Sequence, residues 1–279
     1  PSLIESKYIV RIMEEIKSNF ELDENAEITI EVNPGTVTLE KLEDYNKVGI
    51  NRLSIGLQST HEHLLKEIGR IHTYLDFLDT FRFTREAGFE NINVDLMIGL
   101  PNQTLAEVQD SIEEIVSMEP EHISVYSLIL EEGTTLFKKV EEGLELPDEE
   151  LERKMYWTVK RILEANGYNH YEISNFAKQG YESKHNLDCW NQKEYIGFGV
   201  AAHSYTNGIR YSNIENLEQY IKNYEEDKTE ENLVFHEKQD MEAMQKEYML
   251  LGLRKIDGVS IQEFKIKFVA NPVFLYHDK

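Results

Sequence analysis

Cysteine is almost absent from this chain of 279 residues, which contains Cys189 alone. A single thiol cannot form an internal disulfide, and it cannot by itself hold an iron–sulfur cluster that needs several thiolates. No apolar run approaches the roughly 18 residues of a membrane-spanning helix, so we expect no transmembrane segment. Such low cysteine usage is typical of a reducing compartment, and we therefore expect a cytoplasmic location.

Basic residues are also scarce, because 29 lysines and arginines stand against 52 aspartates and glutamates and give a net charge of −23. Such a field repels nucleic acid and anionic membrane surfaces, so neither is expected as a partner. The simplest role of this charge is to keep the protein dissolved.

The first half of the chain contains an alternation of helix-like and strand-like segments. Hydrophobic residues make up 41% of the chain, enough for a substantial core. Strands are predicted to begin near residues 27, 52, 91 and 122, and helices to cover residues 1–20, 38–49, 60–68, 74–87 and 105–118. Ser2 is predicted to cap the first helix. This alternation predicts a parallel sheet with right-handed crossovers.

Two closures of such a sheet are open at this point, a doubly wound sheet and a (β/α) barrel. Four strands cannot close a barrel, and the first helix has no strand before it. We therefore expect at least one N-terminal βα unit to be missing from this chain.

Beyond residue 130 the alternation of strands and helices ends. There we expect a helix at 148–166, irregular β structure at 168–213, and helices at 216–225, 239–253 and 261–268.

Polar residues interrupt the predicted strands near their carboxyl ends, where parallel βα arrays bind ligands. They are Glu31, Asn33, Gln58, Ser59, Asp95, Ser124, Tyr126 and Ser127. A buried carboxylate is costly unless it is paired or hydrogen-bonded. The convergence of these groups favours a site for a polar ligand with amines or hydroxyls over a set of salt bridges and caps.

Three other patterns have the composition of a site. His61 and His63 resemble a metal-binding pair, but helix residues two apart do not share a face, so we expect a solvated surface. Residues 197–202 imitate a dinucleotide fingerprint without a clear preceding strand, which favours a turn near a ligand mouth. Residues 185–190, His-Asn-Leu-Asp-Cys-Trp, hold groups that can ligate or stack on heme, although composition alone favours a packed loop with a buried tryptophan.

The order of these segments resembles one family, the oxygen-independent coproporphyrinogen III oxidase-like radical-SAM proteins. Nearly the whole chain shares its succession of motifs. They are Glu27-Ile-Thr-Ile-Glu-Val-Asn-Pro-Gly35, Asn51-Arg-Leu-Ser-Ile-Gly-Leu-Gln-Ser59, Ile68-Gly-Arg-Ile-His72, Asn93-Val-Asp-Leu-Met-Ile-Gly-Leu-Pro101, His122-Ile-Ser-Val-Tyr-Ser-Leu128, Glu172-Ile-Ser-Asn-Phe-Ala177 and Gly197-Phe-Gly-Val-Ala-Ala-His-Ser204.

The resemblance implies a partial (β/α)6 TIM-like barrel with four of its six strands present. We expect this barrel at residues 1–135, a smaller α+β region at 136–236, and the start of a helical domain at 237–279. S-adenosylmethionine (SAM) and a [4Fe-4S] cluster are the implied cofactors. The SAM-binding residues implied by the motifs are Glu31, Gln58, Arg70, Asp95, Gly197 and Gly199.

Two departures from the family pattern matter. The family's Cys-x3-Cys-x2-Cys cluster motif is absent, and Pro1-Ser2 looks like the end of a Gly-Gly-Thr-Pro-Ser motif. Residues 185–190 resemble the His-Asn-x-x-Tyr-Trp motif of the heme-chaperone branch, with Cys189 where tyrosine is usual. That resemblance implies heme binding through His185, Cys189 and Trp190, with His185 the first candidate for the iron ligand.

Three hypotheses about function follow. The first is a heme chaperone that binds heme and delivers it to heme-accepting proteins. The second is an oxygen-independent coproporphyrinogen III oxidase that acts in porphyrin biosynthesis. The third is that this chain alone carries out no radical chemistry, because the cluster motif is missing.

Overall fold

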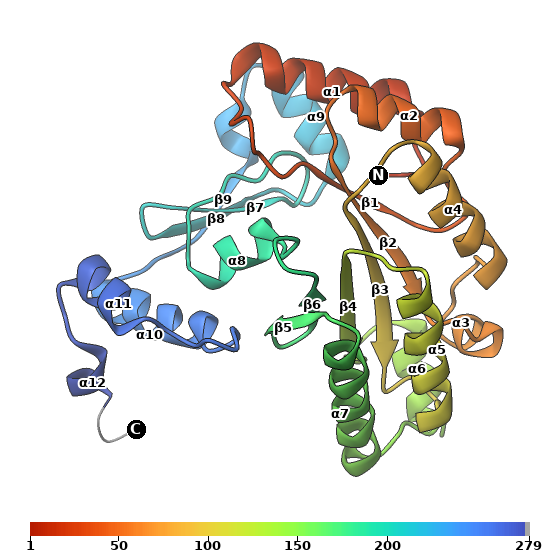
Figure 1. Ribbon diagram of the computed structural model, residues 1–279. Coiled ribbons are helices and arrows are strands. Elements are labelled where there is room, and N and C mark those ends of the chain that lie inside the picture. Colours follow the sequence, from red (N-terminus) through yellow and green to blue (C-terminus); the bar gives the residue numbers. More distant parts are fainter. Residues whose placement is uncertain (277–279) are drawn as a thin grey trace. The chain divides into compact units, whose positions relative to one another are not determined.

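A computed structural model describes residues 1–276 of the chain. The chain divides into two compact units, residues 1–182 and residues 183–279, and each is described by itself (Figure 1). The division into three domains at residues 135 and 236 stays a prediction. Across residues 1–276, none of the helices is long and apolar enough to span a membrane.

The first unit is built on a six-stranded sheet with the order β1-β2-β3-β4-β6-β5. Strands β1 to β4 are all parallel to their neighbours, which confirms the predicted parallel sheet, and β6 runs antiparallel to β4 and β5. The strands are β1 Thr29–Val32, β2 Arg52–Gln58, β3 Ile92–Ile98, β4 His122–Ser127, β5 Asn169–Glu172 and β6 Asn175–Ala177.

Seven helices belong to the described part of the first unit, and six of them agree in place with the predicted ones. The additional helix is α6, a short one in a stretch for which no helix was predicted. The helices are α1 Ser6–Asn19, α2 Leu39–Lys47, α3 Glu62–Glu67, α4 Tyr74–Glu86, α5 Leu105–Ser117, α6 Thr135–Glu141 and α7 Glu149–Ala165.

The start of α1 differs from the expectation. Glu5, not Ser2, is the residue before the first turn, and it makes no capping hydrogen bond. Ser2 is buried, and its hydroxyl accepts hydrogen bonds from the Asn33 amide at 3.2 Å and from the Thr36 hydroxyl at 2.8 Å. The predicted cap is therefore wrong, because the tertiary contact with the end of β1 uses the hydroxyl that a cap would need.

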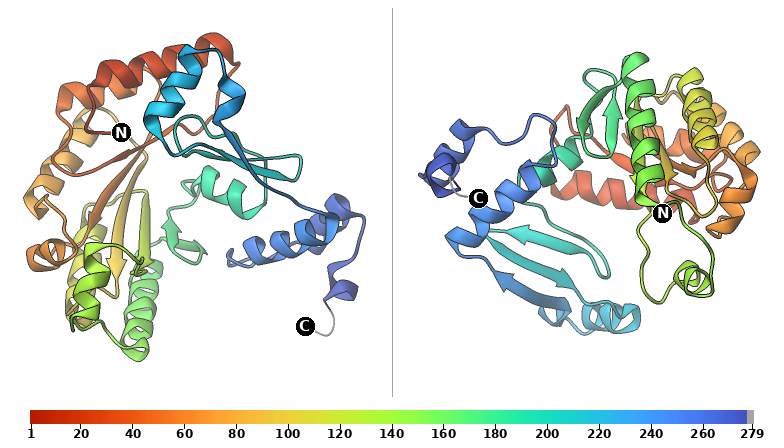
Figure 2. Two further views of the ribbon diagram at one scale, coloured as in Figure 1. Left: turned by 180° about the vertical axis from the view of Figure 1, so that it is seen from behind. Right: turned by 90° about the horizontal axis from the view of Figure 1, so that it is seen from below.

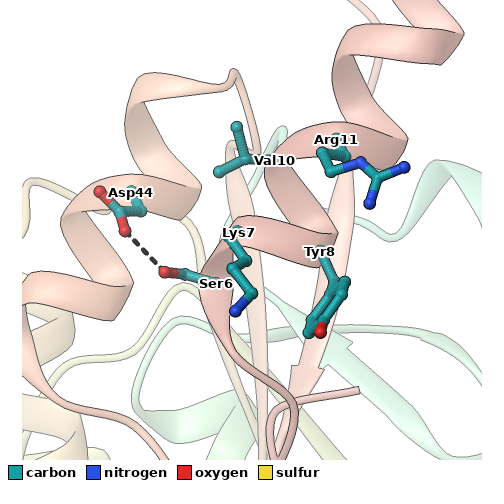
Figure 3. A pocket seen from close by; sticks show the side chains of 6 residues that line it. All are labelled: Ser6, Lys7, Tyr8, Val10, Arg11 and Asp44. Carbon is teal, nitrogen blue, oxygen red and sulfur yellow. Dashed lines mark hydrogen bonds between the residues drawn. The ribbon is translucent and has the colours of Figure 1, made fainter.

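Helices α1 and α2 pack against each other and frame a shallow cavity (Figure 3). Ser6 donates a hydrogen bond of 2.6 Å to the Asp44 carboxylate across this contact. Lys7, Tyr8 and Arg11 line the rest of the cavity, which has a volume of about 410 Å³. The contact holds α1 on the outer surface of the helical layer.

The two faces of the sheet differ in chemistry, and this difference positions the site. Alternate residues such as Leu53, Ile55 and Val94 are buried and pack with helices α2, α4, α5 and α7 into one large apolar core (Figure 2). The residues between them, beginning with Ser54 and Asn93, project from the opposite face. Because side chains alternate along a strand, the polar residues of four neighbouring strands share that face.

The second unit contains a three-stranded antiparallel sheet with the order β7-β8-β9. A small core of Tyr248, Phe264 and Phe268 joins its last long helices. Irregular β structure was expected up to residue 213, but residues 184–190 form helix α8. The elements are α8 Lys184–Trp190, β7 His203–Thr206, β8 Ile209–Asn213, α9 Leu217–Glu225, a 3-10 turn Thr229–Asn232, β9 Leu233–Lys238, α10 Met241–Gly252, α11 Ile261–Phe268 and α12 Pro272–Leu275.

Candidate functional site

A hydrogen-bond network crosses the polar face of the sheet in the first unit, with Asn93 of β3 at its centre. The Asn93 amide nitrogen donates to the Ser54 hydroxyl at 2.7 Å and to the Asp95 carboxylate at 2.8 Å. Ser54 donates in turn to the other oxygen of Asp95 at 3.0 Å. The carboxylate is thus held by neighbours on its own strand and the next, with a fixed orientation.

The other side of this network contains a buried histidine. Nδ1 of His122 donates to Oδ1 of Asn93 at 2.6 Å, and Ser124 donates to the same oxygen at 3.1 Å. Nε2 of His122 lies 2.7 Å from the Tyr171 hydroxyl. Burial, with the nearby Arg52 cation, holds the pKa of His122 well below 6.5. The imidazole is therefore neutral at pH 7, and Nε2 accepts the proton of the Tyr171 hydroxyl.

Asp95 is the carboxylate whose ionisation costs most at this face. Burial raises its pKa, the hydrogen bonds from Asn93, Ser54 and Ser124 lower it, and the negative charge of Glu31 raises it again. The net direction is upward from 3.8. Glu31 and Asp95 therefore lie close enough to repel each other. A positively charged ligand would offset both the burial of the Asp95 charge and its repulsion from Glu31. An ammonium or sulfonium group has the required charge.

The carboxyl ends of β1 and β2 contain a second group of polar residues. Gln58 is buried and its backbone adopts a φ of +76°, an uncommon conformation for a residue with a side chain. A Cβ atom at Gly56 would lie 3.0 Å from Nε2 of the Gln58 side chain, so this amide packs over the glycine. Arg70 donates to the Asn33 side chain at 3.4 Å. Uncommon backbone conformations such as that of Gln58 cluster at ligand-binding sites.

The four residues of this unit that the sequence associates with SAM thus form two neighbouring pairs. Glu31 and Asp95 interact across the sheet face, while Gln58 and Arg70 lie at the strand ends on either side of Asn33 and Gly56. Gln58 is buried, Asp95 and Arg70 are half-buried and Glu31 is exposed, so these charged and amide groups can meet a ligand at the rim of the sheet.

Helix α8 of the second unit presents the candidate heme-binding residues. Ser183 caps the helix by accepting a hydrogen bond of 3.3 Å from the Asn186 amide. The helical turn places Sγ of Cys189 3.8 Å from Nε2 of His185, because residues four apart share a face. Burial and the Asp188 carboxylate raise the pKa of Cys189, so its sulfur is a protonated thiol at neutral pH.

Trp190 ends α8 and has a cation on its ring. The guanidinium carbon of Arg254 lies 4.2 Å from the indole centroid, within the range of a cation–π contact. The indole nitrogen is buried without a hydrogen-bond partner among residues 1–276. Buried donors of this kind are rare, and this one is a group that a bound molecule could satisfy.

The glycine loop of the second unit is tightly built. A Cβ at Gly197 would come within 2.3 Å of the His203 carbonyl oxygen, and Gly199 has a φ of +100°. Asn213 donates to the Gly199 carbonyl at 2.6 Å, and the Gly197 amide donates to the Ser204 hydroxyl at 2.9 Å. The loop is therefore a compact turn without a preceding strand, which agrees with the prediction that it is not a dinucleotide fingerprint.

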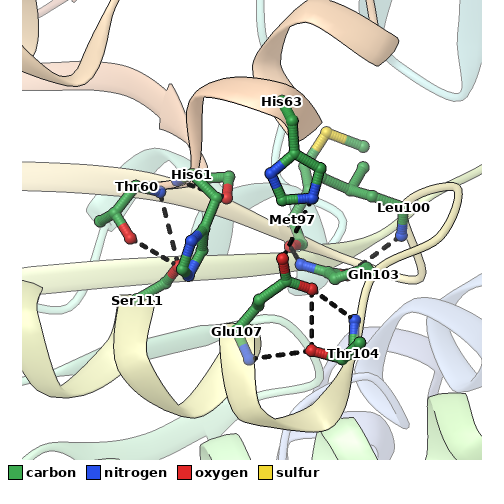
Figure 4. A network of polar contacts seen from close by, with 10 residues as sticks. Thr60, His61, His63, Met97, Leu100, Gln103, Thr104, Glu107 and Ser111 are labelled. Carbon is green, nitrogen blue, oxygen red and sulfur yellow. Dashed lines mark hydrogen bonds and ion pairs between the residues drawn. The ribbon is translucent and has the colours of Figure 1, made fainter.

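His61 and His63 serve a structural contact in place of a metal. Nε2 of His63 lies 3.0 Å from the Glu107 carboxylate, while His61 precedes α3 with an extended backbone (Figure 4). Burial raises the pKa of Glu107, but hydrogen bonds from Thr104 and the charges of both histidines outweigh burial and lower it. No group of three possible metal ligands occurs among the described residues.

Sequence reasoning missed four residues of the network on the polar face. Ser54, Asn93, His122 and Tyr171 were not singled out as candidates, although Asn93 and Asp95 alternate with buried residues of β3. The alternation of polar with buried residues along β2 and β3 was the available signal for Ser54 and Asn93. Tyr171 gave none, because it lies on β5, outside the parallel repeat.

The residues of the chain fit one of the two implied cofactors. Thiolates hold a [4Fe-4S] cluster, and these 279 residues supply only Cys189, so the cluster does not fit them. SAM carries an amino acid group, hydroxyls and a positive sulfur. The carboxylates Glu31 and Asp95 fit the positively charged groups of such a molecule.

Comparisons with known proteins agree with this geometry. The model of the Radical SAM superfamily matches residues 2–115. The heme chaperone HemW of Lactococcus lactis is 38% identical over 280 residues, covering 100% of this chain and 73% of the relative. HemW of Bacillus subtilis is 43% identical over 246 residues, covering 87% of this chain and 64% of the relative.

A solved structure shows the fold. Coproporphyrinogen III oxidase (HemN) from Escherichia coli, a radical-SAM enzyme, superimposes with a TM-score of 0.84 at 20% identity. The match covers 100% of this chain and 66% of that one. The α/β architecture with a parallel sheet is therefore that of the radical-SAM TIM-like fold, as predicted. The chain spans about two thirds of the length of these relatives.

Proposed function

The chain belongs to the heme chaperone HemW family within the radical-SAM superfamily, and from this premise we propose that the protein binds heme and transfers it to heme-accepting proteins. The observation that carries the proposal is helix α8, which presents His185 and Cys189 on one face and ends in Trp190. Family membership supports heme as the ligand, and the chemistry of these side chains supports this helix as its place.

His185 is the proposed iron ligand. It lies on the exposed side of α8, where an imidazole nitrogen can reach a molecule in solvent. Cys189 is the weaker candidate, because a thiolate is the species that ligates iron and the pKa of this thiol is raised. Trp190 supplies an aromatic surface and a buried donor beside the same turn.

The polar face of the first unit is the proposed SAM site. We propose that Glu31 and Asp95 attract the positively charged part of SAM, and that Gln58 and Arg70 bind its polar groups at the strand ends. SAM, when bound beside a reduced cluster, supplies radical chemistry. The cluster does not fit the residues of this chain, so no radical step is derived for it. The SAM contacts of Gly197 and Gly199 stay predictions from the resemblance.

The alternative function, oxidation of coproporphyrinogen III, has less support. The similarity to the oxidase at 20% identity shows a shared fold alone, whereas the named relatives at 38–43% identity are heme chaperones. A reducing compartment such as the cytoplasm is the proposed location, since the chain has one cysteine.

A heme-transfer assay tests the proposal. The protein is loaded with hemin, freed of excess, and mixed with apomyoglobin, whose own Soret band reports the arrival of heme. We expect heme to reach apomyoglobin faster from this protein than from a complex of hemin with serum albumin. Failure to retain hemin through gel filtration, or retention without transfer, contradicts the chaperone function.

A separate titration tests the SAM site. SAM binding is measured by isothermal titration calorimetry for the native protein and for Asp95→Asn, with Asp110→Asn on the solvent side of α5 as the matched control. At least about tenfold weaker binding is expected for the first variant alone, as for the loss of one charged contact. Equal affinity in both variants would remove Asp95 from the proposed site.

A further inference from the structure

A groove between α5 and α7 in the first unit is lined by basic and aromatic side chains. The two helices pack side by side (Figure 1), and Leu105 at the start of α5 lines a cavity of about 600 Å³ together with residues of α7. The α7 side is lined by Arg153, Lys154, Trp157 and Arg161, together with Glu150. Three cations and one carboxylate line the groove, on a chain whose net charge is −23.

Arginine and tryptophan are placed regularly along this face. Arg153, Trp157 and Arg161 follow at intervals of four residues, so they form one stripe along α7. Eight residues of helix separate the two arginines by about 12 Å. Trp157 is 56% exposed, and Nζ of Lys160 lies 5.5 Å from its ring centroid. A large aromatic side chain left in water between two cations is an unusual surface, and aromatic and arginine side chains are enriched in protein interfaces.

The two arginines are available to a partner. Lys154 is already paired with Glu150 at 2.7 Å, whereas the guanidinium groups of Arg153 and Arg161 make no ion pair or hydrogen bond with any residue in the range 1–276. Arginine is the side chain best suited to bind a carboxylate with two parallel hydrogen bonds. The stripe therefore offers two separate carboxylate sites with an apolar surface between them.

The groove starts beside the ligand-binding edge of the sheet. A side chain at Gly99, just after β3, would come within 3.6 Å of the Glu152 carboxyl carbon. The first turn of α7 therefore lies at the carboxyl end of β3, the same edge that ends β1 and β2. A partner that binds the stripe would be held close to that edge.

We propose that the groove of Arg153, Trp157 and Arg161 docks an extended acidic segment of a partner protein, with an apolar residue between two carboxylates. An extended chain advances about 3.3 Å per residue, so carboxylates four residues apart span about 13 Å and match the spacing of the two arginines. The apolar residue between them lies over Trp157 and Leu105. A nucleic acid or anionic membrane presents a continuous negative surface, which the acidic remainder of this chain repels.

The test uses a fluorescein-labelled peptide, Gly-Asp-Ser-Leu-Ser-Asp-Gly, and its twin with asparagine in place of both aspartates. Fluorescence anisotropy with the full chain is expected to show saturable binding of the first peptide and at least about tenfold weaker binding of the second. Addition of salt is expected to weaken the first complex. Equal binding of the two peptides, or no saturation up to about 1 mM of protein, overturns the proposal.

Variants locate the binding. Arg153→Glu with Arg161→Glu is expected to abolish peptide binding, and the milder Arg153→Gln with Arg161→Gln to weaken it at least about tenfold. The matched control is Lys66→Glu with Lys265→Glu, two exposed lysines whose reversal changes the net charge equally. Unchanged binding in the arginine variants, or equal loss in the control, contradicts the assignment.

The same variants also test two other occupants of the groove, an anionic membrane and a second copy of this chain. If the arginine pair governs only flotation with phosphatidylserine vesicles, or only self-association in sedimentation velocity, while the peptide does not bind, the acidic-segment proposal is wrong. These measurements use no heme and no SAM, so their outcome is independent of the proposed function.

Discussion

At the scale of single residues, Asn93 organises the polar face of the sheet. Its amide nitrogen donates to Ser54 and Asp95, and its oxygen accepts from His122 and Ser124. Every hydrogen-bonding position of the side chain is thus used in a buried place, where an unmade hydrogen bond costs about 1–3 kcal/mol. Asn93 thus helps to orient Asp95, together with Ser54.

The neutral state of His122 predicts a pH dependence of stability. Its pKa is lowered in the fold, so the unfolded chain takes up a proton that the folded chain excludes as the pH falls below 6.5. The free energy of unfolding should therefore fall in that range, by at most about 1.4 kcal/mol per pH unit from this residue. His122→Asn should show a smaller slope between pH 7.5 and 5 in urea unfolding.

The comparison must be made on slopes, because the substitution also removes packing and lowers the stability at every pH. A slope in His122→Asn equal to the native one would mean that His122 is not held neutral.

Residue identities at the strand ends were the most predictable part of the candidate site. Glu31, Gln58 and Asp95 could be found because a polar side chain in a parallel strand is costly without a purpose. Their partners could not be found in this way. The pairing of His122 with Tyr171 depends on an antiparallel hairpin that no periodicity in the sequence indicates.

At the scale of the elements, α5 illustrates how short motifs fix a helix start. Thr104 accepts a hydrogen bond from the Glu107 amide at 3.3 Å, and the Glu107 carboxylate accepts from the Thr104 amide at 2.8 Å. This capping box also begins the helix that lines the groove with α7. Helices α2 and α4 start with threonine caps as well, and both begin within one residue of the predicted positions.

Thr104→Ala should destabilise the fold by about 1 kcal/mol, the usual cost of losing a helix cap. Chemical denaturation at pH 7 measures it. Thr104→Ser is the matched control, since its hydroxyl can make the same hydrogen bonds, and it should lie within about 0.5 kcal/mol of the native protein. A loss that is equal in both variants would assign the effect to the methyl group and not to the cap.

Helix α8 marks the limit of prediction from periodicity. Its seven residues, which include one amide and one acid, have little helical pattern, and the sequence alone favours a loop. In the structure, the Ser183 cap begins the helix, and the turn brings His185 and Cys189 onto one face. The prediction of heme binding by this stretch came from the resemblance of whole motifs alone.

At the scale of the whole molecule, the excess of 52 acidic over 29 basic residues dominates the electrostatics. Many ion pairs join exposed side chains on one helix, and such exposed pairs contribute little to stability. Repulsion within the folded chain should therefore oppose folding at low ionic strength. The alternation of strand and helix, which fixes the first unit, is insensitive to this charge.

Raising the NaCl concentration from about 0.01 M to about 0.1 M should increase the melting temperature, because the screening length falls from about 30 Å to about 10 Å. Differential scanning calorimetry measures the shift, with sucrose of equal osmolality as the control. A melting temperature that falls with added salt would show that attractive ion pairs outweigh the repulsion.

The central claim is that α8 binds heme through His185. A hemin titration followed by the Soret band tests it most directly, with the native protein, His185→Ala, Cys189→Ser and the exposed control His63→Ala. The account predicts saturable binding in the native protein, Cys189→Ser and His63→Ala, and the loss of that band in His185→Ala. An unchanged Soret band and affinity in His185→Ala would contradict it.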